Sequence, residues 1–470
     1  RPAGVERVVG TRPVRGATPI RLKRASAGAR SGSGNRRGTA RVGSAETLRR
    51  RRSDEIVRNT IKQAIRATLA RRVPREDGAP AAAVCPPASD TGSIGDEAMI
   101  DALLGELRSR GARVSFIERN DRRDWTQAFE ADEPIAEPTN SLGGWRTFGR
   151  ALAPFGAVFV IGADVIDGKY SPHSSTRALR IADFAARAGR SATVTGASFN
   201  ASPHPDVVAA VRSLHPSVRL LARDARSAER LQKIAPRQTQ LVADLAFLVR
   251  PDDSRIATSL AWLERQRAAG RRAMGVNLGP TALKELEGAT PDDAVAAMAD
   301  SLAPVLRGDE SLAIAAVPHD TRGETSDLTL CRSVVDRIRD EFGDRVFLFD
   351  EDFQPSSIKA FASRLHACVT SRMHLAIACL GSGTPVGAIT YQDKFEGLFD
   401  HFGLAPPAIA GSESASKDKL RTLLDQTLSG ASTQRDTITK RLDGVKRLAA
   451  ANLPEGLFGR PGATDRAAAS

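Results

Sequence analysis

Short apolar runs alternate with amphipathic stretches along most of the chain, and this alternation predicts the fold. From about residue 81 the runs are AAAVC, RVSFIER, AVFVIGAD, SATVTGAS and VRLLARD, separated by helical stretches such as TRALRIADFAARAGR. Short continuous apolar runs are typical of strands that are buried on both faces of a parallel sheet. Repeated strand–helix units therefore predict an α/β domain with a doubly wound parallel sheet.

The pattern pauses near residue 250 and then begins again. The stretch VADLAFLV is followed by RPDD, whose Pro and Asp residues indicate a linker. A second series follows, with the runs RAMGV, SLAIAAV, RVFLF, HACVT and PVGAITY. We expect two Rossmann-like domains, over residues 81–250 and 270–410, with C-terminal helices and a tail over residues 411–470. Because ligands bind open α/β sheets at the carboxyl ends of their strands, two facing sheets predict a cleft between the domains.

The first 80 residues differ in amino-acid composition from the rest of the chain. Residues 1–44 are rich in Arg, Gly, Ser and Ala, and bury too little apolar surface to offset the entropy of ordering, so we expect a disordered tail. Residues 45–72 place Leu, Ile and Val at near-helical spacing among Arg and Lys, which predicts a basic amphipathic helix. Such a helix either lies on an anionic membrane surface or packs on its own domain as a solvated helix. Nucleic acid is not expected as a partner, because this segment has no aromatic side chains to stack on bases.

Charge and cysteine content narrow the class of protein. The net charge of +13 comes from residues 1–75, which hold 21 Lys and Arg against 4 Asp and Glu. The four cysteines form no CxxC pair, which argues against a zinc site and against a disulfide framework, and favours a reducing compartment. No apolar run has the length of a membrane span, and the N-terminus lacks the apolar core of a signal peptide. We therefore expect a cytoplasmic protein, with peripheral contact at the inner face of the plasma membrane if the basic helix binds lipid.

Polar residues follow several of the predicted strands. The loop DTGSIGDEAMI carries Asp96, the loop VIGADVIDGKYSPHSS carries Asp164 and Asp167, the segment VRLLARD ends at Arg223 and Asp224, and VPHD ends at His319 and Asp320. Such residues fit a cleft, and Arg can fork onto a carboxylate or phosphate. The alternatives stay open at each place: a plain turn, a surface loop, a helix cap at Asp224 or a structural histidine.

The segment SRMHLAIACLGSG places two basic residues at the start of a short apolar helix. Arg372 and His374 lie between the strand CVTSR and this helix. Positive charge at a helix N-terminus opposes the helix dipole. We therefore expect an anion to compensate, and a phosphate or carboxylate ligand would serve.

These motifs together resemble the polysaccharide pyruvyl transferase family over roughly residues 85–405. The stretch similar to the family's serine-arginine-x-histidine motif and the loop after it contains Ser371, Arg372, His374, Gly383, Thr384, Pro385, Tyr391 and Lys394. The ARD-x-x-S segment at Arg223, the VADLAFLV segment around Asp244 and the VPHD strand end also look like the family. Two loops depart from its pattern: Ser93 stands where the family usually has Asn, and Gly162-Ala163-Asp164 stands where a glycine triplet is common.

The resemblance implies a glycosyltransferase-B-like fold of two doubly wound domains. It also implies transfer of a carboxyethylidene group from phosphoenolpyruvate to two hydroxyls of a sugar, which forms a cyclic ketal without a metal or other cofactor. The acceptor would be a glycan or lipid-linked sugar of the cell envelope, held by the first domain.

The resemblance also implies roles for particular residues. Arg223 and Arg372 would clamp the donor anion, with Lys394 beside them, and His374 would donate a proton or bind phosphate. We hypothesise Asp164 or Asp96 as the base on the acceptor side, since carboxylates and histidine suit the required proton transfers. Further candidates are His319, Asp167 and Ser371.

Two other functions compete with this one. A sugar-nucleotide-dependent glycosyltransferase of the same two-domain fold would need an acidic residue for the nucleotide ribose, and Asp393 and Glu396 are available. Alternatively the α/β body is a scaffold without activity and the basic tail is the functional part. The presence of Arg223, Arg372 and His374 argues against the scaffold.

Overall fold

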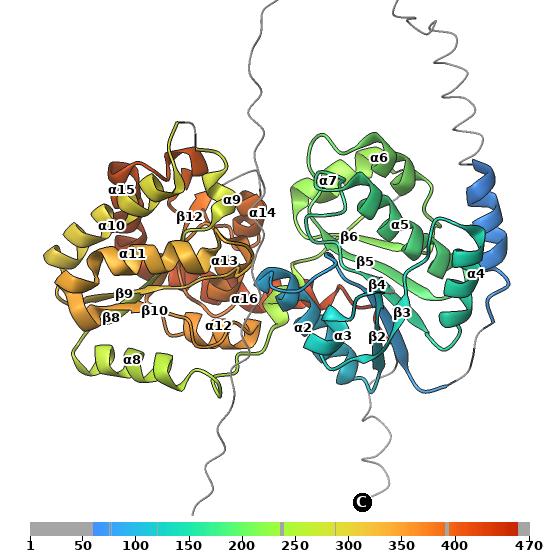
Figure 1. Cartoon of the computed structure of the whole chain (residues 1–470), viewed down its shortest axis with the longest axis horizontal. Coiled ribbons are helices and arrows are strands. Elements are labelled where there is room, and N and C mark those ends of the chain that lie inside the picture. The colour runs from blue at the N-terminus through green and yellow to red at the C-terminus, as the bar shows by residue number, and fades with distance from the viewer. Residues whose placement is uncertain are drawn as a thin grey trace, which may run out of the picture. The chain divides into compact units, whose positions relative to one another are not determined.

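The structure is a computed structural model. It describes residues 60–74, 76, 78–119, 121–235, 239–286, 288–390 and 394–458. The tail expected to be disordered and most of the helix predicted over residues 45–72 lie outside the described residues. The described residues belong to one compact unit, which contains two parallel β-sheets with helices on both faces of each (Figure 1).

The first sheet has seven strands in the order β3-β2-β1-β4-β5-β6-β7, and neighbouring strands pair in parallel. Its strands are β1 (Ala81–Cys85), β2 (Arg113–Glu118), β3 (Asp132–Ala136), β4 (Ala157–Val160), β5 (Ser191–Ala197), β6 (Arg219–Ala222) and β7 (Gln240–Leu241). Its helices are α2 (Ile94–Arg108), α3 (Asp124–Ala128), α4 (Leu142–Ala151), α5 (Pro172–Arg187), α6 (Pro205–Arg212) and α7 (Ala225–Ile234). The apolar runs of the sequence become its central strands because both faces of these strands are covered.

The second sheet repeats this arrangement with six strands in the order β10-β9-β8-β11-β12-β13, again all parallel. Its strands are β8 (Arg272–Val276), β9 (Leu312–Ala316), β10 (Val346–Leu348), β11 (Ala367–Thr370), β12 (Val386–Thr390) and β13 (Ala408–Ala410). Its helices are α8 (Ala257–Ala268), α9 (Pro280–Leu283), α10 (Pro291–Gly308), α11 (Asp327–Phe342), α12 (Pro355–Ala362), α13 (Met373–Leu380), α14 (Lys394–Asp400) and α15 (Lys417–Ser429). Two doubly wound, Rossmann-like sheets confirm the predicted fold class. The strand order reverses between β1 and β4 in the first sheet and between β8 and β11 in the second, so ligand sites are expected at these two points.

The chain crosses between the sheets twice. The first crossing runs from β7 through the 3₁₀ turn η1 (Leu245–Leu248) to α8, where the sequence predicted a linker. The second crossing is helix α16 (Ala431–Ala450), which contacts η1 and ends beside the first sheet. There the buried Asn452 side chain accepts a hydrogen bond from Gly196 N (2.7 Å) and donates one to Ala243 O (2.9 Å). The C-terminal helices are therefore part of the joint between the two sheets.

Residues 60–70 form a helix that packs on the first α/β domain through its C-terminal end. Ala70 is fully buried, and the Arg66 guanidinium lies over the Trp145 ring at 5.6 Å. The other end leaves Ile61 and Ile65 exposed. The C-terminal end of this helix is thus packed on its own domain, as one of the two alternatives stated. The exposed end is compatible with the other alternative, contact with a membrane surface. No helix in the described parts of the chain is long and apolar enough to cross a membrane.

The sequence prediction missed the edge strands β3, β7 and β13. The β3 sequence DEPIA is polar and contains Pro134, and only one of its residues is buried. Edge strands carry charged residues and proline because one side of the strand lacks a partner. The apolar signal of β3 is therefore weak, whereas β7 and β13 were missed because they are only two and three residues long.

Candidate functional site

The loops that follow the central strands of both sheets meet. Ser93, just before α2 of the first sheet, forms an isolated antiparallel bridge with Asp320, which follows β9 of the second sheet. Two residues further along the chain, Gly95 lies close to the His374 ring. A Cβ atom on Gly95 would stand 2.2 Å from His374 Nδ1. The N-terminus of α2 and the N-terminus of α13 therefore enclose one site, which takes residues from both sheets.

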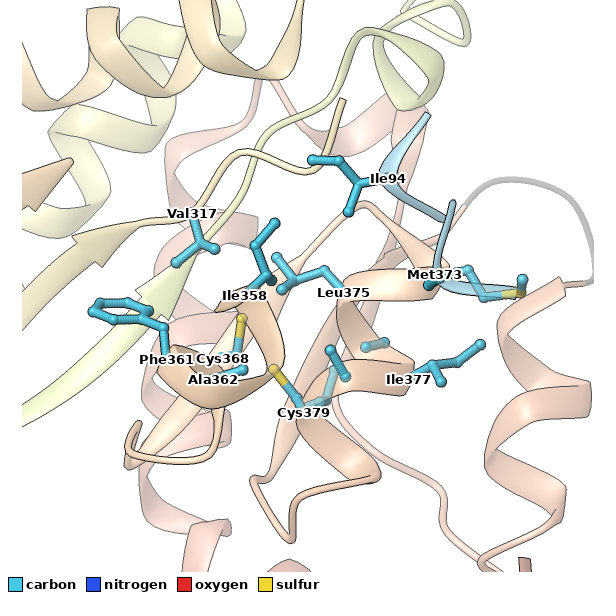
Figure 2. Packing of buried hydrophobic residues seen from close by; sticks show 14 of the residues in the cluster. Ile94, Val317, Ile358, Phe361, Ala362, Cys368, Met373, Leu375, Ile377 and Cys379 are labelled. Atoms are coloured by element: carbon cyan, nitrogen blue, oxygen red, sulfur yellow. The ribbon is translucent and has the colours of Figure 1, made fainter. Parts of the chain in front are cut away.

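Helix α13 holds its first residues in place because it is buried. Its sequence MHLAIACL is apolar on all sides except at His374, as expected of a helix that is enclosed rather than amphipathic. Figure 2 shows Met373, Leu375, Ile377 and Cys379 on this helix, packed among other buried side chains. The helix contacts α2, α12 and η1, so both sheets fix its orientation. The positions of Arg372 and His374 follow from this packing.

A buried charged chain runs from the first sheet to the second. Arg223, after β6, donates from Nη1 to Asp244 Oδ2 at 2.8 Å and from Nε to Ser198 Oγ at 2.7 Å. His374 Nε2 lies 3.7 Å from the same Asp244 oxygen, which is too long for a hydrogen bond; the contact is ionic when the His374 ring is protonated. Burial alone would raise the pKa of Asp244, but His374, Arg223 and the Ala246 N–H hold that pKa well below its usual range. Asp244 is therefore a carboxylate that links two basic groups.

Several buried nitrogens of this site make no hydrogen bond within the described part of the chain. They are Arg223 Nη2, His374 Nε2 and both ring nitrogens of His319. His319 is 95% buried, and burial together with the positive charges of His374 and Arg372 lowers its pKa well below the usual range, so it is neutral. Buried donors without partners cost free energy, so their presence together points to a ligand that satisfies them.

Arg372 is held by carboxylates of the protein. Its Nη2 donates to Asp327 Oδ1 at 2.6 Å and its Nε lies 3.0 Å from both Asp327 oxygens, while Asp320 Oδ2 is 3.5 Å from Nη2. Asp327, at the start of α11, is fully buried. The anion that we expected at the N-terminus of α13 is thus supplied by Asp327 for Arg372 and by Asp244 for His374. A role of Arg372 in binding the donor stays a prediction.

Asp96, on the first turn of α2, is a carboxyl with a perturbed pKa. Burial, followed by the nearby charge of Asp164, raises the pKa of Asp96 to about 6, while His374 and Arg322 oppose the shift. The N-cap residue of α2, Ser93, makes no side-chain capping hydrogen bond, and Glu97 Oε1 accepts the N–H of Gly92, ahead of the helix, at 2.6 Å. A carboxyl that titrates near pH 6 is suited to accept a proton at neutral pH.

Asp164 and Asp167 follow β4 and lie in different surroundings. Asp164 lines a cavity of about 540 Å³ and accepts a hydrogen bond from the Tyr170 hydroxyl at 3.2 Å. Asp167 is buried and organises its own loop, since Oδ1 accepts from Lys169 N (2.9 Å) and Oδ2 accepts from Asn200 Nδ2 (2.6 Å). Asp164 is thus presented to the cavity, and Asp167 shapes it.

The remaining predicted residues either bond to other parts of the protein or lie outside the described residues. Ser371 is buried, accepts from Gly279 N at 2.7 Å and donates to Asn277 at 3.1 Å, so it joins β11 to the end of β8. Asp224 caps α7 by accepting from Ser227 N at 2.7 Å, as one alternative held. Tyr391, Asp393 and the Lys394 side chain lie outside the described residues.

Asp327 was not found from the sequence. It lies 45 residues before its partner Arg372, and in the sequence it reads only as an acidic residue on the first turn of a helix, after the capping residue Ser326. Its one sequence signal is the polar segment HDTRGETSD, which directly follows a strand. The four cysteines are free thiols, and among the residues that the structure describes no group of three or more His, Cys, Asp or Glu side chains could hold a metal ion.

Comparisons with known proteins agree with this arrangement. A family model described as polysaccharide pyruvyl transferase matches residues 94–393. No curated protein sequence matches the chain. Among solved structures, a UDP-N-acetylglucosamine 2-epimerase is similar with a TM-score of 0.51 and 13% identity, over 82% of this chain and 96% of that one. A protein of Listeria monocytogenes described as a UDP-N-acetylglucosamine 2-epimerase has a TM-score of 0.50 and 13% identity, over 80% and 94% of the two chains. At this identity the structural likeness shows the shared glycosyltransferase-B-like fold alone.

The contact between Gly95 and His374 gives a stability prediction. We expect Gly95→Ala to lower the free energy of unfolding by about 1–3 kcal/mol, because the new methyl group must displace the His374 ring in a packed site. Gly105→Ala on the same helix is the control: nothing lies within 4 Å of its Cβ position, and alanine in an exposed helical position should stabilise by about 0.5–1 kcal/mol. Denaturant titration of both variants measures the difference. Equal stabilities would contradict the close contact.

Proposed function

The chain belongs to the polysaccharide pyruvyl transferase family, and from this premise we propose that it transfers a pyruvyl group from phosphoenolpyruvate to two hydroxyls of a sugar. The acceptor is a glycan or lipid-linked sugar that becomes part of the cell surface. The product is a cyclic ketal, and inorganic phosphate leaves. The observation that carries the proposal is the set of buried nitrogens on Arg223, His374 and His319 that make no hydrogen bond to the described residues, at the junction of the two sheets.

Recognition of the donor follows from charge. Phosphoenolpyruvate carries a phosphate and a carboxylate, and Arg guanidinium groups bind both in a forked geometry. Asp244 already orients Arg223, which leaves Nη2 for the ligand. Neutral His319 supplies one N–H donor, and Arg372 adds positive charge that Asp327 keeps in a fixed place. No metal or other cofactor enters the proposal.

The chemistry needs three proton transfers and one departure of phosphate. A first sugar hydroxyl loses its proton and its oxygen bonds to C2 of phosphoenolpyruvate, while a proton adds to the C3 methylene group and makes it a methyl group. The C2–O bond to phosphate then breaks, and the second hydroxyl, losing its proton, bonds to C2 and closes the ketal. We propose His374 as the acid and Asp96 or Asp164 as the base. Asp96 suits the base role best, because its raised pKa makes it a stronger base than an ordinary carboxylate.

Substitution of Arg223 tests donor recognition. We expect Arg223→Lys to lower kcat/KM for phosphoenolpyruvate by about 10- to 100-fold, because lysine keeps the charge but loses the fork that reaches both Asp244 and the ligand. The measurement is acceptor-dependent release of phosphate from phosphoenolpyruvate, with galactose-, mannose- and glucose-terminated acceptors. Arg226→Lys, at an exposed position of the neighbouring helix α7, is the matched control and should keep full activity.

The phosphate-release assay, combined with calorimetry, distinguishes pyruvyl transfer from the competing glycosyltransferase function. A wild-type protein that binds nucleotide sugars in calorimetry, and neither binds phosphoenolpyruvate nor releases phosphate from it, would overturn the pyruvyl transfer in favour of a glycosyltransferase.

The titration of Asp96 gives a pH prediction. A base must be ionised, so kcat/KM should fall as pH drops through about 6, where Asp96 becomes protonated. Asp164→Asn removes a negative charge that contributes to the raised pKa, and should move the midpoint of this fall to lower pH even if the rate is reduced. Asp436→Asn, at an exposed position of α16, should leave the midpoint unchanged. A midpoint that Asp164→Asn does not move would exclude Asp96 as the titrating base.

We also propose a peripheral contact with the inner face of the plasma membrane through the helix over residues 60–70. Ile61 is 54% exposed and Ile65 is 37% exposed, and they lie one turn apart on the helix. Residues 60–74 contain Lys62, Arg66, Arg71 and Arg72 and no acidic residue. Apolar side chains beside positive charge fit an anionic lipid surface, where a lipid-linked acceptor would be found.

Vesicle sedimentation tests the membrane contact. We expect the double variant Ile61→Glu/Ile65→Glu to bind vesicles of phosphatidylglycerol about tenfold or more weakly than the wild type, since two apolar contacts are replaced by negative charge. The control is Leu241→Glu, which changes an apolar residue on β7 that is as exposed as Ile65. Vesicle binding by the double variant that matches the control would refute the contact.

A further inference from the structure

Two cavities lie at the carboxyl end of the first sheet, on either side of the loop after β4. The β5-side pocket, of about 540 Å³, is lined by Asp164, Asp167, Ser198, Asn200, Asp224 and Arg230, among others. The β2-side pocket, of about 430 Å³, is lined by Asp90, Glu118, Trp125, Glu137, Tyr170 and Arg177, among others. The proposed function needs one acceptor sugar, and the first sheet therefore offers more room than that sugar requires.

The β5-side pocket adjoins the reacting groups. Ser198 lines it and accepts the hydrogen bond of Arg223 Nε at 2.7 Å. Asp164, whose charge acts on Asp96, lines it as well. Carboxylate and amide groups on a fixed loop are suited to orient sugar hydroxyls, since each can make two hydrogen bonds. This pocket fits the sugar that receives the pyruvyl group.

Tyr170 stands at the boundary between the two pockets. Its side chain lines the β2-side pocket, while its hydroxyl donates to Asp164 Oδ2, which lines the β5-side pocket. The residue is 57% exposed although one end of the ring is anchored. An exposed aromatic ring held in one orientation is a platform on which the apolar face of a sugar ring can stack at little cost in side-chain entropy.

The β2-side pocket has a fixed floor and a polar wall. Glu118 accepts from the Trp125 N–H at 3.0 Å, and Trp125 Nε1 donates to Ala88 O at 3.0 Å, so the floor joins β2, α3 and the loop after β1. In the wall, Arg177 Nη1 donates to Glu137 Oε1 at 2.9 Å, and both side chains stay partly exposed. An Arg–Glu pair offers forked donors and acceptors to a diol. The pocket lies at the switch point of the sheet between β1 and β4, where parallel sheets bind ligands.

We propose that the two pockets are adjacent sugar subsites, so that the acceptor is an oligosaccharide of at least two units rather than a single sugar. The reacting sugar lies in the β5-side pocket, Tyr170 stacks at the junction, and the next sugar lies in the β2-side pocket. This inference rests on the proposed pyruvyl transfer and names the acceptor class for it.

The test compares acceptors of two sizes on the full chain. Phosphate release from phosphoenolpyruvate is measured with methyl glycosides of galactose, mannose and glucose, and with disaccharides that end in the same sugars. We expect kcat/KM to be about tenfold or more higher for the matching disaccharide, because the second subsite adds binding energy that the monosaccharide lacks. Equal kcat/KM values for both sizes would overturn the second subsite and leave pyruvyl transfer intact.

Variants assign the subsites. Tyr170→Ala and Ser89→Phe, the latter filling the β2-side pocket from an exposed loop, should abolish the preference for the disaccharide. Tyr170→Phe keeps the ring but loses the hydroxyl bond to Asp164 that holds it, so it should keep only part of the preference. The exposed Leu142→Ala on α4 is the control that should leave the preference unchanged. Loss of monosaccharide and disaccharide turnover to the same degree in Ser89→Phe would overturn the proposed order of the subsites.

A binding measurement separates this inference from the proposed function. Saturation-transfer NMR reports disaccharide contact with the wild type and with Ser89→Phe without any turnover. Disaccharide binding that Ser89→Phe weakens, in a protein that releases no phosphate from phosphoenolpyruvate, would keep the subsites and overturn pyruvyl transfer. Absence of disaccharide binding alongside measurable turnover of a monosaccharide would overturn the subsites alone.

Discussion

The site depends on one buried carboxylate, Asp244, which faces Arg223 and His374 from a single oxygen. A buried charge is costly unless it is paired and hydrogen-bonded, and here each basic group is paired with the same anion. The other oxygen of Asp244 accepts the Ala246 N–H at 2.9 Å, so the first residues of η1 hold the carboxylate in place. Fixed charges of this kind do not need to reorganise when a ligand arrives, which is the condition under which they stabilise a transition state most.

Asp244 also lies where the chain passes from one sheet to the other, so the site and the joint share their supports. Lys359, on α12 of the second sheet, is buried and donates from Nζ to Phe247 O of η1 at 2.8 Å; burial lowers the pKa of Lys359 to about 7. On the other side, Asn452 binds Ala243 O, directly before Asp244. A side chain from the second sheet and one that follows α16 thus fix the turn that carries the central carboxylate. A shift at the joint would therefore move Arg223 relative to His374.

The places of the site residues at the ends of strands could be predicted from the sequence, but most of the ion pairs between them could not. Apolar runs precede Asp164, Arg223, His319 and Arg372, and the strands of a parallel sheet end at the same edge. The assembly of a polar site at the strand ends could therefore be predicted from the sequence. The pairing of Asp327 with Arg372 could not be predicted from the sequence, because it depends on where α11 begins relative to β11 in space. The weak edge strands escaped for a different reason, since half-exposed strands such as β3 carry polar residues that hide the apolar signal.

The two departures from the family pattern have physical explanations in the backbone. Ser93 replaces an asparagine, but its bridge to Asp320 is made by main-chain atoms, and its hydroxyl still lowers the pKa of Asp96 against the effect of burial. Ala163 replaces a glycine and has φ of 44°, a left-handed conformation that favours glycine. Its carbonyl accepts the Ser198 N–H at 2.6 Å, so β5 holds the strained residue in position. Asp164, which directly follows this strained position, lines the pocket that Ser198 also lines, and the Ala163 methyl group is buried behind it in the chain.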